Sequence, residues 1–113
     1  AKITEPGSQT WVAKSNGHVI GFIGIKDIGN NIELEGLFIS PEHQRKGVGS
    51  ALIQKVLSTI DGTKPLKLEV LYYNQKAINF YKSFGFKELS NIEGSTIILP
   101  SGKVVRNIVM VRS

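Results

Sequence analysis

The chain has 113 residues, of which 41% are hydrophobic and 20% charged, and its net charge is +5. That length suits one domain with one hydrophobic core, and the composition is typical of a globular protein rather than a disordered one. Because there is no cysteine, disulfides, cysteine-rich metal sites and a cysteinyl acyl-enzyme are excluded; the absence of a long apolar run or a signal-peptide pattern leads us to expect a cytoplasmic protein.

The first third of the chain predicts an antiparallel meander of three strands. Asn16-Gly17 is a strong signal for a two-residue hairpin turn. Gly21 and Gly24 interrupt the returning strand and indicate a bulge or a close backbone approach. The expected elements are a loop over residues 1–10, strands over 11–14 and 18–26, and a turn over 28–31.

The centre of the chain predicts a strand, a short basic loop and a helix. Residues 32–39 are an apolar strand, and Ser40-Pro41-Glu42 ends it. A helix over residues 50–60 follows, because apolar residues recur there at helical spacing and define one buried face. Between them, residues 44–49 read Gln-Arg-Lys-Gly-Val-Gly.

Such a loop presents backbone N–H groups to an anion, since a helix N-terminus carries partial positive charge and glycines let phosphate oxygens approach. A P-loop would need a lysine between Gly49 and Ser50, which is absent. A dinucleotide fingerprint would need a small residue where Leu52 stands, although Glu69 lies at a suitable distance for a ribose-binding acid. The remaining interpretations are a Gln-x-x-Gly-x-Gly phosphate loop and a simple strand–helix turn.

The second half predicts a further strand over residues 66–72, which would pair in parallel with the central strand through a right-handed crossover. Asn74 is expected to cap a second helix over residues 75–84, and Gly85 to end it. Short strands are expected over residues 86–89 and in the tail, around a Pro-Ser-Gly turn at residues 100–102.

Two segments together resemble the GCN5-related N-acetyltransferases, the GNAT family. One is Gln44-x-x-Gly47-x-Gly49, and the other runs from Asn74 through Phe80-Tyr81 to Gly85-Phe86. The resemblance covers residues 11–112. It implies one α/β (α+β) domain over residues 1–113, with a mixed, mostly antiparallel sheet splayed at the central strand, a main helix after the pyrophosphate loop and a second, shorter helix.

The resemblance also implies acetyl-CoA as co-substrate. Its pantetheine arm would meet backbone groups of the central strand, its pyrophosphate the glycine loop, and its other side the second helix. The residues implied in cofactor binding are Leu37, Phe38, Ile39, Gln44, Arg45, Lys46, Gly47, Val48, Gly49, Ser50, Asn74, Asn79 and Tyr81.

Three residues are candidates for catalysis. An amine must lose a proton before it attacks a thioester, so a general base is useful. Glu33 and Glu35 stand two apart on one strand and would share a face, and similar family members place a base at one of these positions; alternatively, both acids merely solvate that face. Tyr81 stands where the family usually keeps a tyrosine near the sulfur; alternatively, it is a core aromatic with a satisfied hydroxyl.

Two functions therefore remain. The first is direct acetyl transfer from acetyl-CoA to a primary amine, with no acyl-enzyme, and the second is a non-catalytic acyl-CoA-binding module. Tyr81 and the two glutamates favour the first. The family normally has another strand and one or two helices before the first hairpin, and only about ten residues stand there, which favours the second. Either the chain is a minimal member, or it is a trimmed form, or a partner subunit supplies the missing acceptor-binding wall. We expect no metal, no nucleic acid and no membrane as partners, because no metal-ligand spacing or basic aromatic stripe occurs. The exposed sheet edge near Trp11 favours a homodimer.

Overall fold

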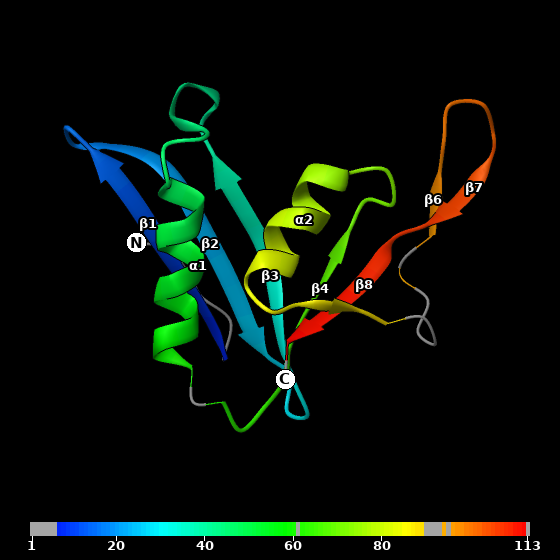
Figure 1. Cartoon of the computed structure of the whole chain (residues 1–113), viewed down its shortest axis with the longest axis horizontal. Coiled ribbons are helices and arrows are strands. Elements are labelled where there is room, and N and C mark those ends of the chain that lie inside the picture. The colour runs from blue at the N-terminus through cyan, green and yellow to red at the C-terminus, as the bar shows by residue number, and fades with distance from the viewer. Residues whose placement is uncertain (1–6, 61, 90–93, 95, 113) are drawn as a thin grey trace. The chain divides into compact units, whose positions relative to one another are not determined.

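Three antiparallel strands and one long helix form the first of two compact units, residues 1–64, and the second unit is residues 65–113. The structure is a computed structural model that describes residues 7–60, 62–89, 94 and 96–112. The elements of the first unit are β1 (Ser8–Ser15), β2 (His18–Asp27), β3 (Ile32–Ile39), the 3-10 turn η1 (Pro41–His43) and α1 (Val48–Thr59). In Figure 1, α1 runs along one face of the β1–β2–β3 meander.

The predicted meander is confirmed, with one correction at its start. Residues 8–10, which were expected to be a loop, belong to β1 and pair with β2 at Lys26, Ile25 and Gly24. Because backbone pairing with β2 holds this segment extended, no apolar periodicity was needed to make it a strand. Of the rest of the expected loop, Gly7 is a turn residue with φ 84°, and residues 1–6 lie outside the described residues.

The turn between β1 and β2 has the predicted chemistry. Asn16 has φ 51° and Gly17 has φ 80°, and two consecutive positive φ angles are what a type I′ hairpin turn requires. Ser15 and His18 close the ladder on either side of it.

Both strand glycines have the predicted role. A Cβ atom on Gly21 would lie 2.9 Å from the Phe38 carbonyl oxygen, so the two backbones approach closely there. Next to Gly24, the β2–β3 register shifts: Ile25 pairs with Leu34 and Gly24 with Gly36. Glu35 therefore has no partner in β2, and β3 is bulged at that residue.

The core of the first unit lies between α1 and the meander. α1 begins two residues before the predicted start, at Val48, and the helical spacing places one of its faces against the strands. The buried residues here are Ile23, Ile25, Ile32, Leu34, Leu52, Ile53 and Val56.

The second unit is built around its last strand. β8 (Ile108–Arg112) pairs antiparallel with both β4 (Leu66–Val70) and β5 (Lys87–Glu88). β6 (Thr96–Ile98) and β7 (Val104–Arg106) form a separate hairpin. The strand predicted over residues 66–72 ends at Val70, because the Asn74 N–H donates to the Leu71 carbonyl and turns the chain.

The second helix, α2 (Gln75–Ser83), has the predicted ends. The Asn74 side chain accepts a hydrogen bond from the Ala77 N–H at 3.1 Å, as an N-cap does. Gly85 has φ 92°, the left-handed conformation expected at the C′ position. α2 contributes Ile78 and Tyr81 to the unit's core, which also includes Leu66, Leu68, Val70, Phe86, Val109 and Met110.

Candidate functional site

The loop between η1 and α1 has two left-handed residues that shape it. Arg45 has φ 64° although it is not a glycine, and Gly47 has φ 83° as the N-cap of α1. A non-glycine residue in this region is uncommon and costs free energy, which makes it a marker of functional loops. Apart from its chain neighbours and the helix backbone, no atom of the described residues lies within 4 Å of the place where a Cβ on Gly47 would stand, so the approach to the backbone is open.

The N-terminus of α1 is suited to bind an anion. The first intrahelical bond runs from the Ala51 N–H to the Gly47 carbonyl, so the N–H groups of Val48, Gly49 and Ser50 have no acceptor inside the helix. No side chain caps this end, and its first turn holds no acidic residue. Unpaired N–H groups and the positive end of the helix dipole therefore coincide.

The side chains beside this N-terminus add positive charge without competing for its N–H groups. Arg45 and Lys46 are exposed. Gln44 turns back instead, and its Nε2 donates to the Ile39 carbonyl at 3.3 Å, which ties the loop to the end of β3. The loop thus suits a phosphate-bearing ligand, because it offers N–H groups, an open backbone and positive charge.

The end of β3 carries the three residues implied in binding the pantetheine arm. Leu37 and Ile39 are half-buried, whereas Phe38 is exposed and its ring stacks on Phe22 with a centroid distance of 5.6 Å. The Phe38 side chain thus packs on Phe22 of the neighbouring strand while part of it stays exposed.

The bulge changes the relation between the two candidate bases. Glu33 is half-buried and stands opposite Lys26 in the β2–β3 register, where opposite charges stabilise a sheet. Glu35 is exposed and is the unpartnered residue of the bulge. Because a bulge interrupts strict alternation, the spacing of two no longer ensures that both carboxylates share a face.

The remaining predicted residues lie on α2 in the second unit. The Asn74 Oδ1 is engaged as the helix cap, and the Asn79 Oδ1 accepts from Gln75 Nε2 at 2.8 Å. Both side chains are exposed, so each keeps its amide N–H groups for a ligand.

Tyr81 is buried, and its ring makes edge-to-face contacts with Phe80 and Phe86 at centroid distances of 5.3 and 5.5 Å. Burial raises the pKa of the Tyr81 hydroxyl above its usual value, because the phenolate would lose its hydration. Tyr81 is therefore a protonated hydrogen-bond donor throughout the neutral pH range.

Sequence reasoning missed one polar contact next to the loop. The Ser40 hydroxyl and His43 Nδ1 are 2.7 Å apart and partly buried, so they brace the turn that leads into the loop. In the sequence, a serine and a histidine three residues apart, on either side of Pro41, were the feature that could have predicted this contact. Among the described residues, no group of three or more His, Cys, Asp or Glu is arranged to hold a metal ion, and no helix is both long and apolar enough to cross a membrane.

Comparison with known proteins gives consistent matches. Residues 2–86 match the model of the "Acetyltransferase (GNAT) family". The thialysine N-epsilon-acetyltransferase of Sus scrofa is 34% identical over 82 residues, which is 71% of this chain and 48% of that protein. A peptidyl-lysine N-acetyltransferase of Escherichia coli is 38% identical over 79 residues, 70% of this chain and 50% of that protein. The chain therefore spans about half the length of these relatives.

Solved structures confirm the predicted fold class. The ribosomal-protein-S18-alanine N-acetyltransferase of Escherichia coli superimposes with a TM-score of 0.83 and 24% identity, covering 96% of this chain and 70% of that one. The PaiA N-acetyltransferase of Thermoplasma acidophilum, solved in complex with coenzyme A, has a TM-score of 0.73 and 24% identity, covering 95% and 61%. At this identity, the likeness shows a shared mixed α+β fold.

Proposed function

Since the chain belongs to the GNAT acetyltransferase family, we propose that it transfers the acetyl group of acetyl-CoA directly to a primary amine, with no acyl-enzyme. The observation that carries the proposal is the open N-terminus of α1, where a left-handed Gly47 precedes uncapped N–H groups. Acetyl-CoA supplies the activated acetyl thioester. The N–H groups of residues 48–50 hold its pyrophosphate, and Arg45 and Lys46 add positive charge.

The chain's own groups then move two protons. Glu33 or Glu35, directly or through a water, takes a proton from the ammonium form of the acceptor so that the neutral amine can attack. As the bond from nitrogen to the acetyl carbon forms and the thioester C–S bond breaks, Tyr81, which its raised pKa keeps protonated at neutral pH, donates a hydrogen bond or its proton to the leaving thiolate. The second proton that the nitrogen loses in becoming an amide then restores the Tyr81 hydroxyl or protonates the thiolate, through water. Leu37, Phe38 and Ile39 would meet the pantetheine arm through their backbone, and Asn74 and Asn79 would meet the cofactor from α2.

We propose an acceptor with a lysine-type side-chain amine. Both named relatives act on such a group, one on thialysine at its ε-nitrogen and the other on peptidyl-lysine. A carboxylate near the acceptor, from Glu33 or Glu35, would favour a cationic amine at neutral pH.

The test combines calorimetric titration of acetyl-CoA with release of free thiol in the presence of lysine, thialysine and a lysine-containing peptide. N-ε-acetyl-lysine is the matched control, because its side-chain nitrogen cannot accept the group. Binding with thiol release that needs a free ε-amine supports the transferase. Binding without release for any amine favours the acyl-CoA-binding module, and no binding contradicts the role of the loop.

The two candidate bases are separated by Glu33→Gln and Glu35→Gln. Loss of the general base is expected to lower kcat by about 10²-fold or more, with little change in acetyl-CoA affinity. The substitution that raises the acceptor KM alone identifies an acid that binds the amine without taking its proton.

We also propose how the protein is organised as a domain, where it is located and how it assembles. The two units act as one catalytic domain over residues 1–113, in the cytoplasm. A homodimer would form through the edge of β1, since an open strand edge offers unpaired backbone groups. Light scattering that gives a monomer mass at high protein concentration would contradict the dimer.

A further inference from the structure

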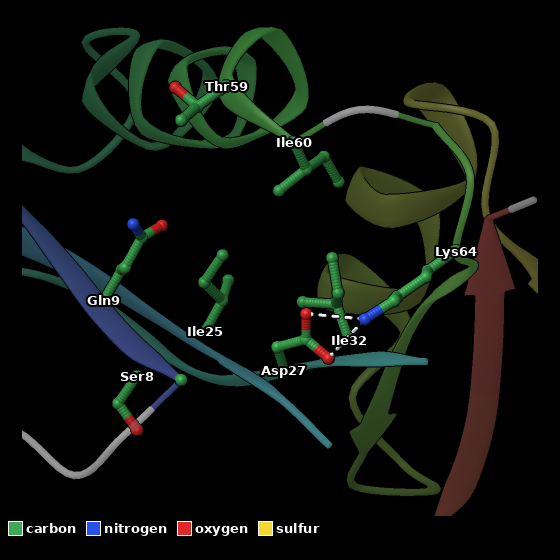
Figure 2. Close-up of a pocket in the computed structure, with 9 residues that line it drawn as sticks. Ser8, Gln9, Ile25, Asp27, Ile32, Thr59, Ile60 and Lys64 are labelled. Carbon is green, nitrogen blue, oxygen red and sulfur yellow. Dashed lines mark hydrogen bonds and ion pairs between the residues drawn. The ribbon is translucent and has the colours of Figure 1, made fainter. Parts of the chain in front are cut away.

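A cavity of about 440 Å³ opens in the first unit, at the end away from the loop that precedes α1. It is bounded by the start of β1, the end of β2, the start of β3 and the C-terminus of α1, whereas the loop follows the end of β3 and precedes the start of α1. Its volume lies in the range of small-molecule sites. Figure 2 shows its lining residues, which no step of the proposed reaction uses.

The floor of the cavity is apolar. Ile25 and Ile32 are buried and come from β2 and β3, and Ile60 follows the last residue of α1. In Figure 2, Ile25 and Ile60 face each other across the space. A branched aliphatic group placed there would be removed from water on several sides, which is favourable.

One wall of the cavity carries adjacent opposite charges. Lys64 Nζ lies 2.8 Å from both carboxylate oxygens of Asp27, and the Gly29 N–H donates to Asp27 Oδ1 at 2.9 Å. These bonds fix the carboxylate, and Figure 2 draws the two from Lys64 as dashed lines. The two side chains are 36% and 43% exposed, so a ligand can reach both.

The ion pair retains hydrogen-bonding capacity. An ammonium has three donors and a carboxylate about four acceptor sites, so Lys64 can donate and Asp27 can accept once more without separating. The C-terminus of α1, at Thr59 and Ile60, adds partial negative charge on the same cavity. A singly charged ligand would meet one group of the pair favourably and the other unfavourably, whereas a zwitterion matches both.

We propose that this cavity binds a free α-amino acid with a branched aliphatic side chain. Its ammonium group binds Asp27, its carboxylate binds Lys64, and its side chain lies on Ile25, Ile32 and Ile60. The site is separate from the acetyl-CoA loop, and ligand binding there does not depend on the proposed acetyl transfer.

The experiment titrates the full chain with L-leucine and follows backbone amide shifts by NMR. Saturable shifts are expected at Asp27, Gly29 and Lys64. Leucinamide keeps only the ammonium charge and N-acetyl-leucine only the carboxylate, so each is expected to bind about tenfold or more weakly. These three ligands test the unaltered protein, so the result does not depend on whether a variant folds.

Substitutions at Asp27 and Lys64 then test whether each charged group contributes to leucine binding. Asp27→Asn and Lys64→Met are each expected to weaken leucine binding by about tenfold or more. Glu42→Gln and Lys55→Met remove the same charges elsewhere in the first unit and are expected to leave the affinity unchanged. The proposal is overturned by the absence of saturable shifts up to about 10 mM leucine, by equal binding of the three ligands, or by unchanged binding in both cavity variants.

Discussion

Burial gives the Tyr81 side chain two properties that a substitution can separate, ring packing and a protonated hydroxyl. Tyr81→Phe keeps the ring that contacts Phe80 and Phe86 and removes only the donor. If the hydroxyl protonates the leaving thiolate, kcat falls by about 10²–10⁴-fold, while the thermal midpoint and acetyl-CoA affinity stay close to those of the unaltered protein. The measurements are thiol release, calorimetry and thermal unfolding. An unchanged kcat would assign Tyr81 to the core alone.

The lowered pKa of Asp27 predicts that the stability of the folded protein depends on pH. The hydrogen bond from Lys64, followed by that from the Gly29 N–H, lowers the pKa of Asp27 below its usual value of 3.8. A lowered folded-state pKa stabilises the protein above the unfolded pKa, and this contribution is lost as the pH falls through the folded pKa. The thermal midpoint of Asp27→Asn should therefore be slightly below that of the unaltered protein at pH 7, and the difference should vanish in acid.

The effect of Asp27→Asn is expected to be small, because the pair is solvent-exposed and screened by salt. Its matched control is the same substitution in a Lys64→Met background, where the main partner is already gone and the pH-dependent part should shrink. A midpoint difference that persists unchanged below the lowered pKa would mean that Asp27→Asn acts through something other than charge.

At the scale of elements, variants of Asn74 distinguish whether its side chain caps α2, contacts the cofactor, or does both. Asn74→Ala removes the cap on the Ala77 N–H and should cost about 1 kcal/mol of unfolding free energy, measured in urea. Asn74→Asp keeps the capping oxygen but replaces the amide N–H groups with negative charge. It should retain stability and weaken acetyl-CoA binding if the amide meets the cofactor. Unchanged binding in Asn74→Asp would leave Asn74 as a cap only.

The β2–β3 pair offers a second element-scale test. Gly21→Ala would place a methyl group 2.9 Å from the Phe38 carbonyl oxygen and 3.0 Å from Ile39 Cδ1, so the strands must separate locally at a cost of about 1–3 kcal/mol. Gly36→Ala is the control, because no described residue other than its two chain neighbours has an atom within 4 Å of its Cβ position. Urea unfolding should separate the two variants clearly, and equal midpoints would refute the close approach.

The elements that sequence could predict are those set by neighbouring residues. The Asn16-Gly17 turn, the Asn74 cap and the Gly85 helix end each follow from the conformational preference of one or two residues. The start of β1 and the bulge at Glu35 could not be predicted in the same way, since both depend on how two strands align. The Gly21 and Gly24 signals indicated that a bulge or close approach exists, but not which residue of β3 it leaves unpartnered.

For the whole molecule, the glycine loop before a helix could be predicted from the motif because its geometry is local to residues 44–50. The Asp27–Lys64 pair had no sequence signal, because 37 residues separate its members. The predicted site residues likewise fall in two units, with residues 33–50 in the first and 74–81 in the second. Sequence order alone does not say whether one ligand engages both groups.

A hydrogen-exchange experiment on the whole chain addresses that question. If acetyl-CoA binds both groups, amides of residues 44–52 and of residues 74–82 should both gain protection at saturating ligand. At a concentration near 100 times Kd, the folded state should be stabilised by about 2.7 kcal/mol, and the thermal midpoint should rise accordingly. The β6–β7 hairpin, which carries no predicted site residue, is the internal control.

Protection confined to residues 44–52 would keep the phosphate loop and remove Asn74, Asn79 and Tyr81 from the cofactor site. Protection in neither segment would contradict the loop itself, because its uncapped N–H groups are the first that a bound pyrophosphate must engage.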